Sequence, residues 1–391
     1  MIIRQAQARL QRLAKGFPVV VLTGPRQSGK TTLARQVFPE HPYVSLEDLD
    51  IRERVTRDPR GFLAQYRQGA VIDEVQRVPE LLSYLQLVVD DSKEMGRFIL
   101  TGSQNLLLSS HVSQSLAGRA AYMELLPCCY AELGNLVHRQ TLDELMVRGG
   151  FPALFDRDVA HADWHASYLG TYVERDVRQI SRVADLMLFQ RFLKMMASRT
   201  GQLLNMNAIG ADLGVAHTTI RDWLNVLETS FVVFRLPPYH GNFGKRLVKT
   251  PKLYFYDTGL AAHLLGITDA GVLNSHPMRG ALYENYLVTE YLKYCRNFGS
   301  ANQLYFWRDN IGTEIDLLIE RAGVLWPVEM KSGATFQAEW LRGIRAWAGH
   351  TAGARKGSGM LISAAPGNAW RDGILTAHWR DALLALDDER Q

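Results

Sequence analysis

The sequence predicts an α/β protein in three parts: a parallel-sheet domain (residues 1–135), a helical domain with a winged-helix pattern (136–275) and a small α/β module (276–391). Two observations support this fold class. In the first part, apolar strand-like runs alternate with helical stretches, which is typical of a parallel sheet covered by crossover helices. The first of these runs leads directly into a glycine-rich loop and then a helix. A chain of 391 residues is also too long for one compact core.

The elements follow from the pattern of apolar residues. Apolar positions three and four apart, as in Leu186–Met196, predict a mostly helical region from Asp143 to Glu228. A loop and strand region follows Pro237-Pro238, and a helix, strands and a hairpin begin near Pro277. The strands of the first domain are predicted at Val19–Leu22, Tyr43–Leu46, Ala70–Ile72, Phe98–Leu100 and Tyr122–Leu125.

Composition excludes several classes of protein. No stretch approaches the roughly 20 apolar residues that a membrane helix needs. The segment Met1–Gly16 lacks the continuous apolar core and the cleavage site of a signal peptide. The cysteines Cys128, Cys129 and Cys295 form neither a disulfide framework nor a metal-ligand spacing. We therefore expect a soluble, cytoplasmic protein with no membrane partner, and the net charge of +4 permits a nucleic-acid partner without requiring one.

The most informative motif is Gly24–Thr31, which lies between an apolar strand and a helix. Gly24 and Gly29 permit backbone conformations closed to other residues, so that successive N–H groups and the helix N-terminus can hold a triphosphate. We expect Lys30 to reach the β- and γ-phosphates and Thr31 to bind Mg²⁺. The fixed spacing argues against an accidental glycine-rich turn. The sequence therefore predicts an ATP site formed by Gly24, Pro25, Arg26, Gln27, Ser28, Gly29, Lys30, Thr31 and Thr32.

Two adjacent carboxylates, Asp73 and Glu74, end the third strand. Set beside the P-loop strand, this strand would place Asp73 on Mg²⁺ and Glu74 against the attacking water. With Lys30, these are the predicted catalytic residues. A further strand ends in a polar segment, and we expect Thr101 or Ser103 to contact the γ-phosphate. The alternative interpretation of Asp73 and Glu74 is an ordinary strand end that carries acidic residues.

Arg119 precedes the last strand of the predicted sheet, and two interpretations of it stay open. It could point out of the subunit and stabilise transition-state charge on the nucleotide of a neighbour. The active species would then be a homo-oligomer, for which a hexameric ring is one arrangement. Alternatively, Arg119 is an ordinary surface arginine, whose aliphatic stem packs on the protein while its guanidinium group stays in water.

In this order, Gly24–Thr31, Val71–Glu74, Thr101–Ser103 and Gly118-Arg119 resemble the module of AAA+ ATPases. The chain beyond them resembles the domain of unknown function that commonly follows this module in predicted prokaryotic ATPases. Together the resemblances cover nearly the whole chain and imply hydrolysis of ATP to ADP and phosphate, but they imply no further substrate. The second resemblance lies in Gly149–Pro152, Tyr172–Asp176, Leu236–Tyr239, Lys245–Tyr254 and Asp257–Leu260.

The segment Asn205–Leu224 has the pattern of a helix-turn-helix, with Gly214 at the tight turn. His217, Thr218 and Arg221 are left on the outer face, where they could meet a DNA groove and its phosphates. Asp222 would repel phosphate locally, and winged helices in ATPases also serve as lids or subunit contacts. Both interpretations stay open. A basic segment without acidic residues follows and suits a wing that binds DNA through Lys245, Arg246, Lys249 and Lys252.

Two antiparallel strands are predicted at Thr313–Ile319 and Leu325–Lys331. Because strand side chains alternate, Glu329 and Lys331 share one face. With Asp316 on the partner strand and Glu284 on the preceding helix, this arrangement resembles the PD-(D/E)xK nuclease fold. Asp316 and Glu329 would hold Mg²⁺, and Lys331 would orient water or stabilise the developing charge on phosphorus. A salt-bridged hairpin is the alternative, and the fold can be retained without turnover.

These features lead to three hypotheses. The first is an oligomeric AAA+ ATPase that binds DNA through its middle and C-terminal domains. The second is an ATP-controlled, Mg²⁺-dependent DNA endonuclease. The third is a signalling switch or scaffold that binds a protein partner and no DNA.

Overall fold

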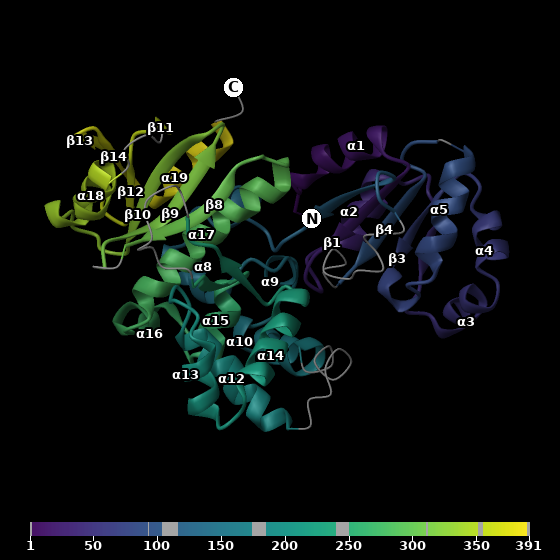
Figure 1. The fold of residues 1–391 in the computed structure, drawn as a ribbon, viewed down its shortest axis with the longest axis horizontal. Coiled ribbons are helices and arrows are strands. Elements are labelled where there is room, and N and C mark those ends of the chain that lie inside the picture. The colour runs from purple at the N-terminus through teal and green to yellow at the C-terminus, as the bar shows by residue number, and fades with distance from the viewer. Residues whose placement is uncertain are drawn as a thin grey trace.

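A computed structural model describes residues 2–92, 94–103, 116–173, 185–239, 250–309, 312–350 and 355–388. Figure 1 shows two sheet-containing regions on either side of the molecule, with a group of helices from the middle of the chain below and between them. Within the described residues, no helix is both long enough and apolar enough to cross a membrane. The three cysteines, all buried, form no disulfide.

The N-terminal region contains a parallel sheet with the strand order β2-β3-β4-β1-β5. All five predicted strands are confirmed. One expectation is corrected: β3, which ends in the acidic pair, does not lie beside the P-loop strand β1, because β4 lies between them. The strands are β1 (Val19–Thr23), β2 (Tyr43–Ser45), β3 (Ala70–Asp73), β4 (Phe98–Gly102) and β5 (Ala120–Glu124).

Helices cover both faces of this sheet, which explains why β1 is apolar and buried along its whole length. On one face, Val20 and Leu22 pack with residues of α1 (Ala6–Gly16) and α2 (Lys30–Val37). On the other face, Val19 and Val21 pack with residues of three further helices. These are α3 (Leu49–Arg57), α4 (Pro59–Gln65) and α5 (Leu81–Ser92), and a 3₁₀ turn, η1 (Val75–Arg77), precedes α5.

The middle of the chain is mostly helical, as predicted. Its first helices are α7 (Tyr130–Leu133), α8 (Leu142–Arg148), α9 (Ala153–Asp156) and α10 (His161–Tyr168), with short turns at η3 (Gly134–Leu136) and η4 (Leu169–Val173). The winged-helix pattern follows as α12 (Leu186–Ser198), α13 (Met206–Leu213), α14 (His217–Thr229), β6 (Val233–Leu236) and β7 (Lys252–Phe255). The last helices of this region are α15 (Thr258–Leu264) and α16 (Ala270–Ser275).

The winged-helix prediction holds in its local geometry. Gly214 ends α13 in the left-handed conformation, with φ 71°, which allows the sharp turn into α14. Ile209 and Leu213 of α13 and Ile220 and Leu224 of α14 are buried. After α14, β6 and β7 pair as an antiparallel hairpin. The two helices and the hairpin therefore share a core.

The C-terminal region is a mixed sheet with the order β13-β14-β12-β10-β9-β8, and β11 also pairs with β10. The predicted antiparallel pair is confirmed as β9 and β10, which turn at Ala322 and Gly323 with φ of 50° and 74°. The helices are α17 (Arg279–Phe298), α18 (Arg342–His350) and α19 (Trp379–Asp388), with a 3₁₀ turn at η5 (Ala338–Leu341). The strands are β8 (Gln303–Arg308), β9 (Glu314–Arg321), β10 (Val324–Lys331), β11 (Arg355–Lys356), β12 (Met360–Ser363), β13 (Ala369–Arg371) and β14 (Ile374–His378).

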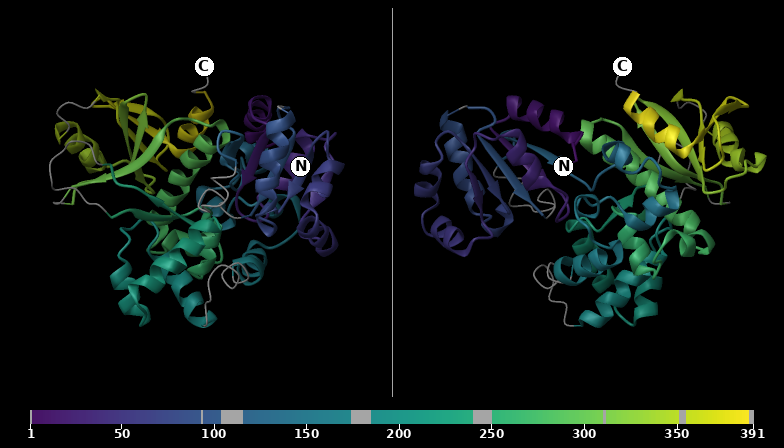
Figure 2. Two further views of the ribbon diagram at one scale, coloured as in Figure 1. Left: turned by 45° about the vertical axis from the view of Figure 1, so that its right-hand side comes forward. Right: turned by 180° about the vertical axis from the view of Figure 1, so that it is seen from behind.

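Helix α17 connects the parts of the molecule. Its apolar residues, among them Leu282 and Leu287, belong to one hydrophobic core that also contains residues of the middle helices and of the C-terminal sheet. Near its other end, the backbone carbonyl of Phe298 accepts a hydrogen bond of 3.1 Å from Arg12 of α1. The view from behind in Figure 2 shows α1, in purple, beside α17, in green. The winged helix and the C-terminal sheet are thus packed into one body.

Candidate functional site

The P-loop runs from the end of β1 to the start of α2, and its shape depends on glycine. Gly24 has φ 149°, and a Cβ atom there would lie 2.1 Å from the carbonyl oxygen of Leu125, a contact that no side chain tolerates. Gly29, at the start of α2, has φ 92°. The loop therefore takes a compact path against the end of β5 that leads its backbone into the helix N-terminus.

Lys30 and Thr31 begin α2, and both side chains are held at the loop. Lys30 is buried, and its ammonium group donates hydrogen bonds to the carbonyl oxygens of Gly24 (3.0 Å) and Pro25 (2.7 Å). The Thr31 hydroxyl donates to the Asp73 carboxylate, with oxygen–oxygen distances of 3.1 and 3.2 Å. A hydroxyl and a carboxylate side by side are oxygen ligands suited to Mg²⁺, so these residues fit a magnesium ion.

Asp73 is almost fully buried, and hydroxyl groups from neighbouring strands also bind it. Thr101 on β4 donates to one carboxylate oxygen. Tyr43 on β2 donates to the other at 2.8 Å. Burial, followed by the hydrogen bond to Asp73, raises the pKa of Tyr43 to about 12, so this phenol stays protonated and donates. The carboxylate is therefore held in one orientation toward Thr31.

Glu74 follows in a left-handed backbone conformation with φ 57°, which is unusual for a residue other than glycine. Such conformations often occur at functional sites. The Ser103 hydroxyl donates to the Glu74 carboxylate at 3.0 Å, and the Gln76 amide donates to both residues. Glu74 is only partly buried, so its carboxylate can meet a water molecule. Thr101 and Ser103 thus bind the two acidic residues.

The remaining predicted residues of the loop lie at the same end of the sheet. Ser28 is fully buried, and its hydroxyl oxygen has no hydrogen-bond partner within the described chain. Arg26 is 9% exposed and lies 3.7 Å from a carboxylate oxygen of Glu47. Gln27 has φ 60°, and Thr32 is exposed on α2.

Arg119 lies at the opposite end of the sheet. It directly precedes β5, which runs parallel to β1, so about 15 Å of strand separates it from the P-loop of its own chain. Its guanidinium group binds the Asp90 carboxylate at 2.5 and 2.9 Å, and both side chains are partly exposed. Arg119 therefore cannot serve the nucleotide site of its own subunit, whereas contact with a neighbouring subunit stays a prediction.

Sequence reasoning missed three residues near the nucleotide site: Arg4, Tyr43 and Gln76. The buried guanidinium of Arg4 donates to the carbonyl oxygens of Ser28 and Leu126, each at 2.6 Å, and pairs with Glu132 of α7 at 3.1 Å. These partners are far from Arg4 along the chain. Only Gln76, two residues after Glu74, carried a local signal.

The predicted DNA-contacting residues have different outcomes. His217, Thr218 and Arg221 are exposed on α14, as expected, and the Arg221 guanidinium lies 3.7 Å from the Asp222 carboxylate. Lys245, Arg246 and Lys249 lie outside the described residues. The prediction for Lys252 is corrected, because its side chain is 2% exposed and lies between carboxylates rather than on a wing surface.

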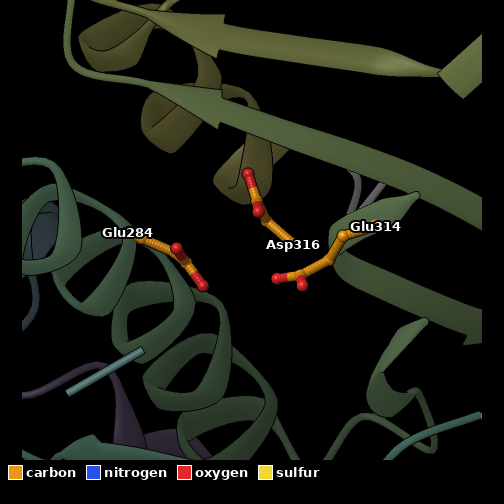
Figure 3. A group of neighbouring side chains, drawn as sticks. All are labelled: Glu284, Glu314 and Asp316. Carbon is orange, nitrogen blue, oxygen red and sulfur yellow. The ribbon is translucent and has the colours of Figure 1, made fainter. Parts of the chain in front are cut away.

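Three acidic side chains converge where α17 meets β9. Figure 3 shows Glu284 on α17 pointing toward Glu314 and Asp316 of β9. Each offers a carboxylate oxygen, and these oxygens lie within 4.8 Å of one another. We call this group the acidic cluster. Glu314 was missed, although its position two residues before Asp316 puts it on the same face of the strand.

Two lysines bind this group and its neighbour Glu329. The Lys252 ammonium lies 2.8 Å from Glu284 and also contacts Glu314. Lys331 lies 2.5 Å from Glu329 and 3.8 Å from Asp316. Burial raises the pKa of Glu284 to about 7 and that of Glu329 to about 8. The four predicted nuclease-like residues therefore do lie together, but with lysine ammonium groups between the acids.

Similarity to known proteins agrees with this architecture. A family model described as an AAA domain matches residues 16–134, and two described as domains of unknown function match residues 139–271 (DUF8612) and 279–378 (DUF4143). The uncharacterized protein Rv2008c of Mycobacterium tuberculosis is 36% identical over 336 residues, which cover 85% of this chain and 74% of that protein. This chain belongs to the same family. The candidate nucleotide site described above thus lies in the AAA domain, which has a P-loop ATPase fold, and the acidic residues Glu314 and Glu329 lie in the DUF4143 domain.

Two further matches are more distant. An uncharacterized protein of Haemophilus influenzae is 23% identical over 290 residues, with 66% of this chain and 71% of that protein covered. Among solved structures, the Walker-type ATPase of Pyrococcus abyssi has a TM-score of 0.46 and 15% identity, and covers 66% of this chain and 94% of its own.

Proposed function

We propose that this protein is an ATP hydrolase, converting ATP and water to ADP and phosphate, that assembles as a homo-oligomer and binds DNA through its winged helix. The observation that carries the ATPase proposal is the pairing of Thr31 with Asp73 beside a buried Lys30, with Glu74 held at the end of β3. The AAA-domain match over residues 16–134 supports it.

In this proposal, the chain binds and orients the triphosphate. Backbone N–H groups of the P-loop and of the start of α2 hold the phosphate oxygens. Lys30 exchanges the carbonyl oxygens of Gly24 and Pro25 for phosphate oxygens and offsets their charge. A magnesium ion bound by Thr31 and Asp73 would neutralise charge that develops on the phosphates. Glu74 orients the attacking water, while Ser103 and Gln76 hold its carboxylate in place.

The proposal is tested with two variants that fail at different steps. Lys30→Ala should lose binding of a fluorescent ATP analogue. Glu74→Gln should bind the analogue as the wild type does, but hydrolyse ATP at least about 100-fold more slowly. Glu80→Gln, at an exposed position nearby, is the control and should hydrolyse normally. If both test variants turned over ATP like the wild type, the assignment of this site would be wrong.

DNA binding is supported by the exposed face of α14 and by the hairpin that follows it. His217, Thr218 and Arg221 lie at the start of α14, which is the part of a recognition helix that meets base edges. We expect affinity for labelled duplex DNA to fall steeply as salt is raised. Arg221→Ala should lower the slope of log affinity against log salt by about 1, whereas Arg57→Ala, exposed on α3, should leave it unchanged.

Two alternatives give different results in related experiments. If duplex, single-stranded and junction DNA all fail to bind at low salt, the protein is a switch or scaffold for a protein partner. The second alternative is a Mg²⁺-dependent endonuclease, in which the acidic cluster would have to exchange the Lys252 ammonium group for a metal ion. Plasmid cutting that needs Mg²⁺ and is lost in Lys331→Ala would support that activity, and equal cutting by both proteins would indicate contamination.

A further inference from the structure

The acidic cluster lies where three parts of the fold meet. One of them supplies a lysine ammonium group to the cluster. Glu284 comes from α17, and Glu314 and Asp316 come from β9. Lys252 comes from β7, the second strand of the winged-helix hairpin. A strand from one domain thus places a charged side chain in the acidic site of another.

The Lys252 side chain is fixed at this position. It is 2% exposed, and its ammonium group lies 2.8 Å from Glu284 and in contact with Glu314. Tyr254, two residues later on the same face of β7, donates a hydrogen bond of 2.5 Å to the same carboxylate oxygen of Glu284. The ammonium also lies 5.6 Å from the centre of the Phe306 ring. Backbone pairing of β7 with β6 holds the strand.

Cationic groups of the chain itself offset most of the negative charge around the cluster. Lys252 pairs with Glu284 and Glu314, Arg308 lies 3.2 Å from Glu314, and Lys331 binds Glu329. Carboxylates that are buried or half-buried, as these are, would be destabilising without counter-charges. A magnesium ion would need carboxylate oxygens at about 2.0–2.1 Å, in the space that the ammonium group occupies, and the two cations would repel each other. The cluster as folded therefore does not fit a divalent cation.

We propose that the Lys252 ammonium group permanently replaces a divalent cation in this nuclease-like site, so that the site joins the winged helix to the C-terminal sheet and binds no metal. The role of the cluster is then mechanical: it connects β7, α17 and β9 through charge. This inference is independent of the proposed ATPase function, because none of these residues contacts the P-loop.

The test asks whether removal of the lysine creates a metal site. Terbium(III) is the probe, since its emission is sensitised by nearby tyrosines such as Tyr254. Wild type and Glu284→Gln should show the same terbium emission. Lys252→Met should gain an emission component that disappears in the double variant Lys252→Met/Glu284→Gln. A second measurement is thermal unfolding: Lys252→Met should have a Tm several degrees below that of the wild type in EDTA, and Mn²⁺ should restore much of this loss.

Two results would overturn the inference. One is wild-type emission that falls in Glu284→Gln, because the native cluster would then already bind metal. The other is a folded Lys252→Met protein with neither metal-dependent emission nor a metal-dependent Tm. If Lys252→Met does not fold, Lys252→Gln, which keeps a polar chain without the charge, takes its place under the same criteria. Lys252→Arg keeps the charge and should stay insensitive to Mn²⁺.

Discussion

Gly24 shows how a single residue can decide whether the nucleotide site forms. The residue combines φ 149° with a backbone approach so close that a Cβ atom would lie 2.1 Å from the Leu125 carbonyl oxygen. The obstacle is backbone at the end of β5, not a side chain that could rotate away. A methyl group at this position therefore has to displace either the loop or the strand.

Gly24→Ala should accordingly lower the free energy of unfolding by about 1–3 kcal/mol or more and abolish binding of ATP analogues. Gly16→Ala is the matched control, because Gly16 lies in α1 with no atom within 4 Å of its hypothetical Cβ. That change should be neutral or stabilise by up to about 1 kcal/mol. Denaturant unfolding and nucleotide titration measure both effects. A Gly24→Ala protein with wild-type affinity would contradict this account of the loop.

Residues of the nucleotide site could be predicted where the motif is continuous in sequence. Lys30 and Thr31 follow the glycines at fixed spacing, and Asp73 ends an apolar strand, so the sequence itself carried the signal. Tyr43 could not be predicted, because its contact with Asp73 depends on the pairing of β2 with β3. Lys252 was assigned to the wrong environment for a related reason. A lysine in a basic stretch is expected to be exposed, and its acidic partners become visible only in the folded structure.

At the scale of secondary-structure elements, α10 carries a buried histidine with an unusual environment. His165 is fully buried, its Nε2 lies 3.1 Å from the Arg148 carbonyl oxygen, and its Nδ1 has no hydrogen-bond partner within the described chain. Burial lowers the pKa of His165, and His263 and His161 lower it further, whereas Asp257 acts in the opposite direction. The neutral form of the His165 ring is therefore the one that packs against α8 and α15.

This lowered pKa predicts acid sensitivity. The unfolded chain binds a proton at His165 more readily than the folded chain does, so the contribution to stability is present above the unfolded pKa of about 6.5 and is lost as pH falls. His165→Gln can keep a donor for the Arg148 carbonyl but cannot titrate. The Tm of the wild type should fall more between pH 7.5 and pH 5 than that of the variant. Parallel curves would show that His165 does not titrate differently on folding.

The helices and strands themselves were largely predictable from the sequence, but the order of the strands within the N-terminal sheet was not. Each strand of the N-terminal sheet was visible as an apolar run because both faces of the sheet are covered. The insertion of β4 between β1 and β3 depends on which crossover passes over which face, and no single segment records this. The hairpin of β9 and β10 was easier, because two alternating strands meet at a short turn.

For the whole molecule, the position of Arg119 makes the assembly testable. The residue lies at the end of the sheet remote from its own P-loop, in an exposed pair with Asp90. If Arg119 completes the site of a neighbour, Arg119→Ala should lower kcat by about 1,000-fold while nucleotide affinity stays near the wild-type value. Arg57→Ala is the control and should retain activity.

Mixing experiments separate this role from a structural one. Lys30→Ala subunits have an intact Arg119, and Arg119→Ala subunits have an intact P-loop, so mixing the two inactive proteins should restore part of the ATPase activity. Mixing Lys30→Ala with Glu74→Gln should restore none, because each subunit then lacks a working site of its own. Equal results from the two mixtures would indicate that Arg119 does not act on the nucleotide site of a neighbouring subunit.

Helix α17 connects the AAA domain to the winged helix. Its 20 residues span about 30 Å. In its C-terminal half, Glu290 accepts a hydrogen bond from the backbone of Tyr130, and Lys293 donates one to the carbonyl of Cys128. Asn285, eight residues before Lys293, bonds the backbone of Phe255. About 12 Å of helix separates Asn285 from Lys293, so a tilt of about 10° at one anchor displaces the other by about 2 Å. We therefore expect a rotation of the AAA domain to be transmitted through α17 to β7 of the winged helix.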